Sequence, residues 1–315
     1  MNTNRPAPAP LDNEVAEGPP DGRGIWLRTS DHTRLRAGLW HANAAKGTVL
    51  LLPGRTEYVE KYGRTAQVLA EAGYATLALD WRGQGRSDRA LADPMVGHVA
   101  DFAEYQDDLD TLLAFAQTQG LPQPFHILAH SMGGCIALRG LIRGLPVRSA
   151  AFTSPMWGIL IAPLLRPIAN TLPDLAHAFN FDHLYAPGTG AQTYVTTVAF
   201  SGNTLTTDPD MWAYMKRQAE AHPALSLGGP SYGWLRAALK ECRALARCAS
   251  PTTPCFCAYG NLERIIDTKP IRARMKNWPN GRLTLVHGAE HEILMERPAL
   301  RHSFLAEAIA LYAAN

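Results

Sequence analysis

The feature that most constrains the fold is residues 125–134, where a short apolar run meets a serine and then becomes a helical pattern. The part before Ser131 is typical of a buried strand, and the part after it of a helix start. Small residues, Ala129 and Gly133, stand two positions before and after the serine, which lets backbone segments pass closely at a sharp turn. The sequence therefore predicts a strand–turn–helix with one hydroxyl at its tip.

The chain around this motif alternates between strand-like and helix-like patterns. Apolar runs predict strands at 25–29, 35–40, 48–52, 74–79, 147–153, 255–259 and 282–287. The first two are typical of an antiparallel hairpin, and helical patterns separate most of the others. Such alternation with short connections predicts an α/β fold, with a mostly parallel central sheet and helices on both faces.

The alternation stops between residues 154 and 233, where aromatic and turn residues mix without strand periodicity. A long irregular block inside an alternating pattern favours an inserted cap over a loop. The predicted core then consists of residues 24–153 and 234–315. Residues 1–23 are rich in Pro and Ala and lack the apolar core of a signal peptide, so we expect a disordered tail there.

Composition excludes several classes of function. The 315 residues carry 30 basic and 28 acidic side chains, so no global field favours nucleic acid. The five cysteines have no metal-ligand spacing, and reduced thiols favour a cytoplasmic protein without a bound metal. The glycine-containing loop at residues 82–87 lacks the Lys-Ser/Thr ending of a phosphate loop. We expect no cofactor.

A serine nucleophile needs a base, and the base must be held by an acid. In this topology the acid and then the histidine follow the serine, each after a later strand. His291 lies just past the last predicted strand and is the expected base. Two carboxylates follow the preceding strand. Glu263 is nearer the strand end and is preferred, while Asp267, placed as a helix N-cap, is the alternative acid.

The tetrahedral oxyanion of such a reaction needs preorganised amide donors. One expected donor is the N–H of Met132, the residue after the serine. The other should come from the loop after the first core strand, and the N–H of Arg55 is the best placed.

Five segments together resemble the α/β-hydrolase fold, and within it the lysophospholipase and monoglyceride lipase group (serine aminopeptidase S33-like hydrolases). They are Leu-Pro-Gly-Arg-Thr-Glu-Tyr-Val-Glu-Lys-Tyr (52–62), Asp-Trp-Arg-Gly-Gln-Gly-Arg-Ser (80–87), His-Ser-Met-Gly-Gly (130–134), Glu-Arg-Ile-Ile-Asp (263–267) and His-Glu-Ile-Leu-Met-Glu (291–296). The resemblance covers about residues 24–313. It implies Ser131 as nucleophile, His291 as base and Glu263 as acid. Two departures are Ala129 in place of glycine and Pro53 in place of a frequent histidine.

The resemblance implies a carboxylic-ester hydrolase that releases a fatty acid from a lysophospholipid or monoacylglycerol through an acyl-enzyme. An aminopeptidase of the same fold is the alternative within enzymes, and its cap would need acidic groups for a free amino terminus. The candidates are Asp174, Asp182, Asp208, Asp210 and Glu220. A non-catalytic ligand-binding protein on this fold is the alternative from another class.

The predicted cap is rich in aromatic side chains. Packing in the core explains most of them, although some must face the cleft over the serine. An apolar cleft suits a single acyl chain. Within residues 160–175, leucine and isoleucine side chains follow helical spacing. This face could touch a membrane surface transiently to collect a lipid, so we expect a cytoplasmic protein with a peripheral membrane contact.

Overall fold

A computed structural model describes residues 6–162 and 166–315 of the chain, and within them a nine-stranded sheet forms the centre of the fold. The strands follow the order β1-β2-β3-β5-β4-β6-β7-β8-β9 across the sheet. Their bounds are β1 Pro8–Ala9, β2 Arg23–Arg28, β3 Arg34–Trp40, β4 Thr48–Leu52, β5 Ala75–Asp80, β6 Phe125–His130, β7 Ser149–Thr153, β8 Cys255–Gly260 and β9 Gly281–Val286. Strands β4 to β9 pair in parallel, and β1, β2 and β3 add an antiparallel edge. The predicted α/β class and its hairpin are confirmed.

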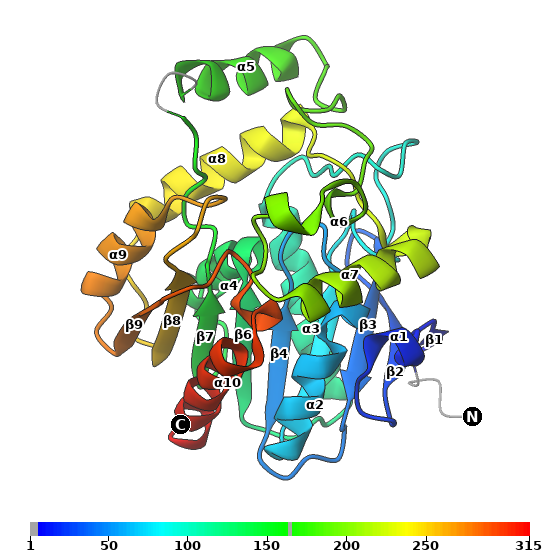
Figure 1. Ribbon diagram of the computed structural model, residues 1–315, viewed down its shortest axis with the longest axis vertical. Helices are drawn as coiled ribbons and strands as arrows, with labels where there is room; N and C mark the ends of the chain where they lie inside the picture. Colours follow the sequence, from blue (N-terminus) through cyan, green and yellow to red (C-terminus); the bar gives the residue numbers. More distant parts are fainter. Residues whose placement is uncertain (1–5, 163–165) are drawn as a thin grey trace.

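The sheet is covered by helices on both faces (Figure 1). The α-helices are α1 Asn13–Ala16, α2 Gly63–Glu71, α3 Ala103–Thr118, α4 Ser131–Ile142, α5 Arg166–Ala178, α6 Tyr194–Thr197, α7 Pro209–Ala221, α8 Tyr232–Ala246, α9 Thr268–Lys276 and α10 Pro298–Ala313. Short 3₁₀ helices are η1 Val59–Tyr62, η3 Phe200–Gly202, η4 Pro223–Leu225 and η5 Ile293–Met295.

Period-two alternation divides the core into two clusters, one on each face of the sheet. In β4, Leu50 and Leu52 pack with residues of α3, α4 and α8, whereas Val49 and Leu51 pack with residues of α2, α7 and α10. Both faces of the central strands are therefore buried, which explains why they appear in the sequence as unbroken apolar runs.

The predicted disorder of residues 1–23 is wrong for the described part of that segment. Residues 8–9 pair with β2, and α1 packs against α7. The hydroxyl of Tyr214 donates to the carbonyl of Ala16 at 2.6 Å, and the side-chain Nε2 of Gln218 donates to the carbonyl of Val15 at 2.7 Å. The prediction counted only the few apolar side chains of the segment, and these main-chain contacts with a distant helix are invisible to composition. Residues 1–5 lie outside the described residues.

The segment between β7 and α8 carries α5, α6 and α7 and lies largely above the sheet in Figure 1. Its α7 belongs to the core, since Met211, Tyr214 and Met215 are buried in the α2 and α10 cluster. In contrast, α5 packs against α8 and keeps large apolar side chains in solvent. Of the predicted face at 160–175, Leu164 and Leu165 lie outside the described residues. No helix within the described ranges is long and apolar enough to cross a bilayer.

Candidate active site

Ser131 lies at a strained turn between β6 and α4. It has a φ of 48°, a left-handed conformation that is uncommon outside glycine and concentrates at functional sites. The turn is also crowded, because a Cβ added to Gly133 would lie 2.1 Å from the carbonyl oxygen of Leu52. Ala129 is fully buried, so its methyl group is accommodated within the sheet. The predicted strand–turn–helix is confirmed.

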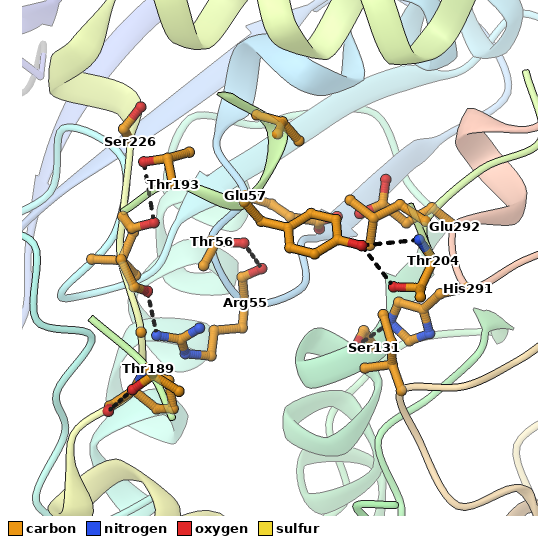
Figure 2. A pocket seen from close by; sticks show the side chains of 18 of the residues that line it. Arg55, Thr56, Glu57, Ser131, Thr189, Thr193, Thr204, Ser226, His291 and Glu292 are labelled. Carbon is orange, nitrogen blue, oxygen red and sulfur yellow. Dashed lines mark hydrogen bonds between the residues drawn. The ribbon is translucent and has the colours of Figure 1, made fainter. Parts of the chain in front are cut away.

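The structure brings His291 to this serine from the loop that follows β9. Its Nε2 lies 2.9 Å from Ser131 Oγ, and its Nδ1 lies 2.7 Å from Glu263 Oε2 (Figure 2 shows the serine and histidine side chains facing one another). Because a carboxylate accepts only, Nδ1 is the protonated nitrogen of the neutral ring. Nε2 is then the acceptor that faces the serine hydroxyl.

Glu263 is held by its own loop as well as by the histidine. Its Oε1 accepts the amides of Ile265 at 2.7 Å and Ile266 at 3.1 Å. Burial alone would raise the pKa of Glu263, but the hydrogen bond from His291, the charge of that ring when it is protonated, and the two amides lower it to about 2. The carboxylate is therefore ionised at neutral pH, in the state that can orient an imidazole.

Asp267, the alternative acid, makes a different contact among the described residues. It is the N-cap of α9 and accepts the Lys269 amide at 3.0 Å. Of the two carboxylates weighed from the sequence, only Glu263 bonds to His291 in the structure.

The two expected oxyanion donors lie at the carboxyl ends of adjacent strands. Leu52 of β4 pairs with Ala129 of β6, so the loop that begins at Pro53 runs beside the serine turn. Met132 is in the first turn of α4, where amide groups have no partner within the helix. Arg55 stands two residues after Pro53 and lines the same pocket as Ser131.

The loop that carries Arg55 is held in place by hydrogen bonds to side chains that the sequence did not reveal as part of the site. Gln84 donates from Nε2 to the carbonyl of Gly54 at 3.0 Å and accepts the Thr56 amide at 3.0 Å. Glu57 accepts the Gly54 amide and the hydroxyl of Tyr62. Gln84 comes from the loop at 82–87, which positions backbone here. These contacts fix the direction of the Arg55 amide.

Glu57, His130 and Glu292 are three buried groups whose ligand atoms lie close enough together to hold a metal. Lys61 already supplies a positive charge there, because its Nζ lies 2.7 Å from Glu57 and 2.8 Å from Glu292. Burial would raise the pKa of Glu57, but the Lys61 ammonium holds it at about 2. Burial lowers the pKa of His130 to about 3, and its Nδ1 contacts Thr153 Oγ1 at 2.9 Å. The chemistry of this cluster is that of a buried ion pair network.

A pocket of about 550 Å³ opens over Ser131 and His291. Its walls come from the loop after β4, the segment at 188–205, α7, the loop at 226–230 and the start of α8. Most of the surface exposed in it is apolar, and Met156, Ile159, Val195, Met215, Leu227 and Ile266 are among the side chains that line it. The site therefore joins a hydrogen-bonded serine to a cavity suited to hydrocarbon.

The sheet order and the serine turn define an α/β-hydrolase, which agrees with the resemblance in the sequence. Residues 43–298 match the sequence model of the family described as serine aminopeptidase, S33, and the chain belongs to that family. Solved structures at low identity share the fold. A soluble variant of monoglyceride lipase from Saccharomyces cerevisiae covers 91% of this chain and 94% of its own, with a TM-score of 0.69 at 18% identity.

Two curated relatives are similar over most of their length. Lysophospholipase L2 of Escherichia coli is 37% identical over 268 residues, which cover 80% of this chain and 76% of the relative. Monoacylglycerol lipase of Mycolicibacterium smegmatis is 26% identical over 254 residues, covering 80% and 83%. The predicted membership of the lysophospholipase and monoglyceride lipase group is confirmed.

Proposed function

We propose that this protein is a serine carboxylic-ester hydrolase that releases a fatty acid from a single-chain lipid, such as a lysophospholipid or a monoacylglycerol. The observation that carries the proposal is the chain of hydrogen bonds from Ser131 through His291 to Glu263 at the base of an apolar pocket. The names of the relatives above support the same class of substrate.

In the proposed mechanism, Ser131 Oγ attacks the ester carbonyl while His291 Nε2 takes its proton. Glu263 orients the imidazole and stabilises its positive charge. The amides of Arg55 and Met132 donate to the oxyanion, and His291 returns the proton to the leaving alcohol. A water molecule, deprotonated by His291, then attacks the acyl-enzyme and frees the fatty acid. None of these steps uses a metal or an organic cofactor.

The aminopeptidase alternative has no matching observation in the pocket. The acidic residues considered for it lie elsewhere, since none of them lines the cavity. Asp174 pairs with Arg236, Asp210 with Arg64, and Glu220 with Lys216. The carboxylates that do line the pocket, Glu57 and Glu292, are both bonded to Lys61. A non-catalytic protein would not need the serine, histidine and glutamate in hydrogen-bond contact.

A substrate panel tests the proposal. The purified protein is incubated with a lysophospholipid, a monoacylglycerol and amino-acid arylamides, and released fatty acid or arylamine is measured. Fatty acid is expected from at least one of the two lipids, at a rate well above that of arylamine release. Turnover confined to the arylamides would contradict the lipid proposal and favour the aminopeptidase.

We further propose that the segment over the pocket acts as a cap that touches lipid surfaces transiently while the protein remains cytoplasmic. Large apolar side chains are exposed along one stretch of it: Leu160, Ile168, Leu175, Phe179, Phe181 and Leu184. The free energy of such a face falls when it enters the boundary between the headgroups and the acyl chains of a membrane.

Vesicle binding tests the cap contact. The double variant Phe179→Asp/Phe181→Asp is expected to bind phosphatidylcholine–phosphatidylglycerol vesicles at least about tenfold more weakly than the unchanged protein, because two aromatic side chains no longer leave water. Leu285→Asp is the matched control, since Leu285 is also an exposed apolar residue but lies on edge strand β9. Equal binding by all three proteins, in sedimentation with the vesicles, would contradict the contact.

A further inference from the structure

The side chain of Arg55 is a cation in the pocket with no acidic partner among the described residues. Its Nη2 donates to the carbonyl of Gly228 at 2.8 Å, and the guanidinium lies 5.2 Å from the centre of the Trp234 ring. The Nε atom is buried and makes no hydrogen bond to any described residue. No carboxylate in the described part of the chain forms an ion pair with it.

Other arginines withdrawn from water have their charge or their donors satisfied by the protein. Arg36 contacts Asp80 at 2.7 Å and Glu60 at 2.5 Å. Arg82 contacts Asp108 at 2.7 Å, with two more carboxylates nearby. Arg89 forms no ion pair with a carboxylate in the described ranges, but it donates to four backbone carbonyls. In contrast, Arg55 makes one carbonyl bond, and most of its donors make no hydrogen bond to a described residue.

The guanidinium nevertheless remains charged. Burial lowers the pKa of Arg55 to about 10, which is still well above neutral pH. A half-buried charge without a counter-ion among the described residues is costly to keep, and the face of Trp234 offsets only part of that cost. A ligand that brings an anion to this position would supply the missing counter-charge and the missing acceptors.

The position of this cation relative to the reacting serine limits which ligand it can meet. Arg55 lines the pocket that holds Ser131 and His291, and Figure 2 shows its side chain on the opposite side of the pocket from His291. The two carboxylates of the pocket, Glu57 and Glu292, are bonded to Lys61, so the ammonium there is not free for an anion. Arg55 is thus a cation of the lining that no carboxylate of the described residues pairs with.

We propose that Arg55 is a specificity-determining residue that binds the phosphate of a glycerophosphate headgroup while Ser131 attacks the acyl ester. The pocket would then favour phosphate-bearing single-chain esters over neutral monoacylglycerols. This inference rests on the proposed function of the same site. Guanidinium groups suit this task because their planar fork meets two phosphate oxygens at once.

The dimensions of the substrate agree with this assignment. In a lysophospholipid the phosphorus lies six covalent bonds from the ester carbonyl carbon, an extended span of roughly 7 Å. Five bonds separate the Cα of an arginine from its Cζ, a span of roughly 6 Å. One residue can therefore donate its backbone N–H to the ester oxygen and its side chain to the phosphate of the same molecule.

The test measures a ratio of rates, so that any effect of Arg55 on the ester chemistry itself cancels. Three substrates with one acyl chain are compared: 1-acylglycerol, its 3-phosphate and its 3-phosphocholine derivative. Arg55→Met is expected to lower kcat/KM for both phosphate-bearing substrates, relative to 1-acylglycerol, by about 10- to 100-fold. Arg55→Lys keeps a charge and is expected to recover part of the ratio.

Arg143→Met is the matched control, since it removes the same charge from an exposed pair with Asp110. In this variant the ratio of kcat/KM between the phosphate-bearing substrates and 1-acylglycerol is expected to stay within about twofold of that of the unchanged protein, because surface ion pairs contribute little free energy. An unchanged ratio in Arg55→Met overturns the inference. If the unchanged protein releases no fatty acid from any of the three substrates, the proposed function fails, which is a different result.

A second measurement covers the case in which Arg55→Met does not fold. Hydrolysis of a p-nitrophenyl ester by the unchanged protein is followed in the presence of glycerol 3-phosphate or of glycerol. Competitive inhibition by the phosphate alone, weaker in Arg55→Lys, supports the assignment. Equal inhibition by both compounds, or none by either, overturns it.

Discussion

Ser131→Ala is expected to lower the rate of p-nitrophenyl ester hydrolysis by about 10⁴- to 10⁶-fold. The alanine variant keeps the pocket and the amide donors but has no oxygen to form the acyl-enzyme. Because the effect falls on the chemical step, kcat should drop while the variant still binds substrate. Steady-state kinetics, with the fold checked by circular dichroism, measures both quantities.

Ser154→Ala is the matched control for this substitution. Ser154 follows β7 as Ser131 follows β6, is fully buried, and also has a positive φ, of 41°. Its Oγ has no hydrogen-bond partner among the described residues, so loss of the hydroxyl removes no contact. We expect activity within about twofold of the unchanged protein. If Ser131→Ala retains more than about a tenth of the activity, Ser131 is not the nucleophile.

Glu263→Gln is expected to lower kcat by about 10³- to 10⁴-fold. The glutamine can still accept the amides of Ile265 and Ile266, so the loop should keep its shape. It loses the negative charge that stabilises the imidazolium, and its amide can favour the wrong tautomer of His291. The measurement is kcat for the same p-nitrophenyl ester at neutral pH.

Asp267→Asn is the matched control for the acid. Asparagine caps helices about as well as aspartate, so α9 should keep its N-cap bond to the Lys269 amide. Activity within about threefold of the unchanged protein is expected. Should Asp267→Asn cost orders of magnitude while Glu263→Gln does not, the assignment of the acid is reversed.

The site was predictable from the sequence to the extent that it follows from local pattern and chain order. Ser131 has a strand before it and a helix after it, and both signals are local. His291 and Glu263 were found because parallel strands end at the same edge of a sheet, so the loops after later strands must approach the serine. The structure brings all three side chains into hydrogen-bond contact.

What the sequence did not predict depends on contacts between distant segments. The hydrogen bonds of Gln84 to the loop at 54–57 join residues about thirty positions apart, and the pairing of Lys61 with Glu292 spans 231 positions. In the packing of residues 8–16, main-chain carbonyls accept hydrogen bonds from side chains of α7. Every residue has such a carbonyl, so the sequence does not show which ones are used. That no described carboxylate pairs with Arg55 is likewise visible only when the neighbours of its guanidinium are known.

Covalent labelling tests the central assignment most directly. The protein is treated with diisopropyl fluorophosphate, and its intact mass and its peptides are measured while ester hydrolysis is followed. We expect one adduct per chain, located on the peptide that contains Ser131, loss of activity in proportion to labelling, and no adduct in Ser131→Ala. An adduct at another residue that accounts for the loss of activity, or full activity after Ser131 is completely labelled, would contradict the assignment of Ser131 as the nucleophile.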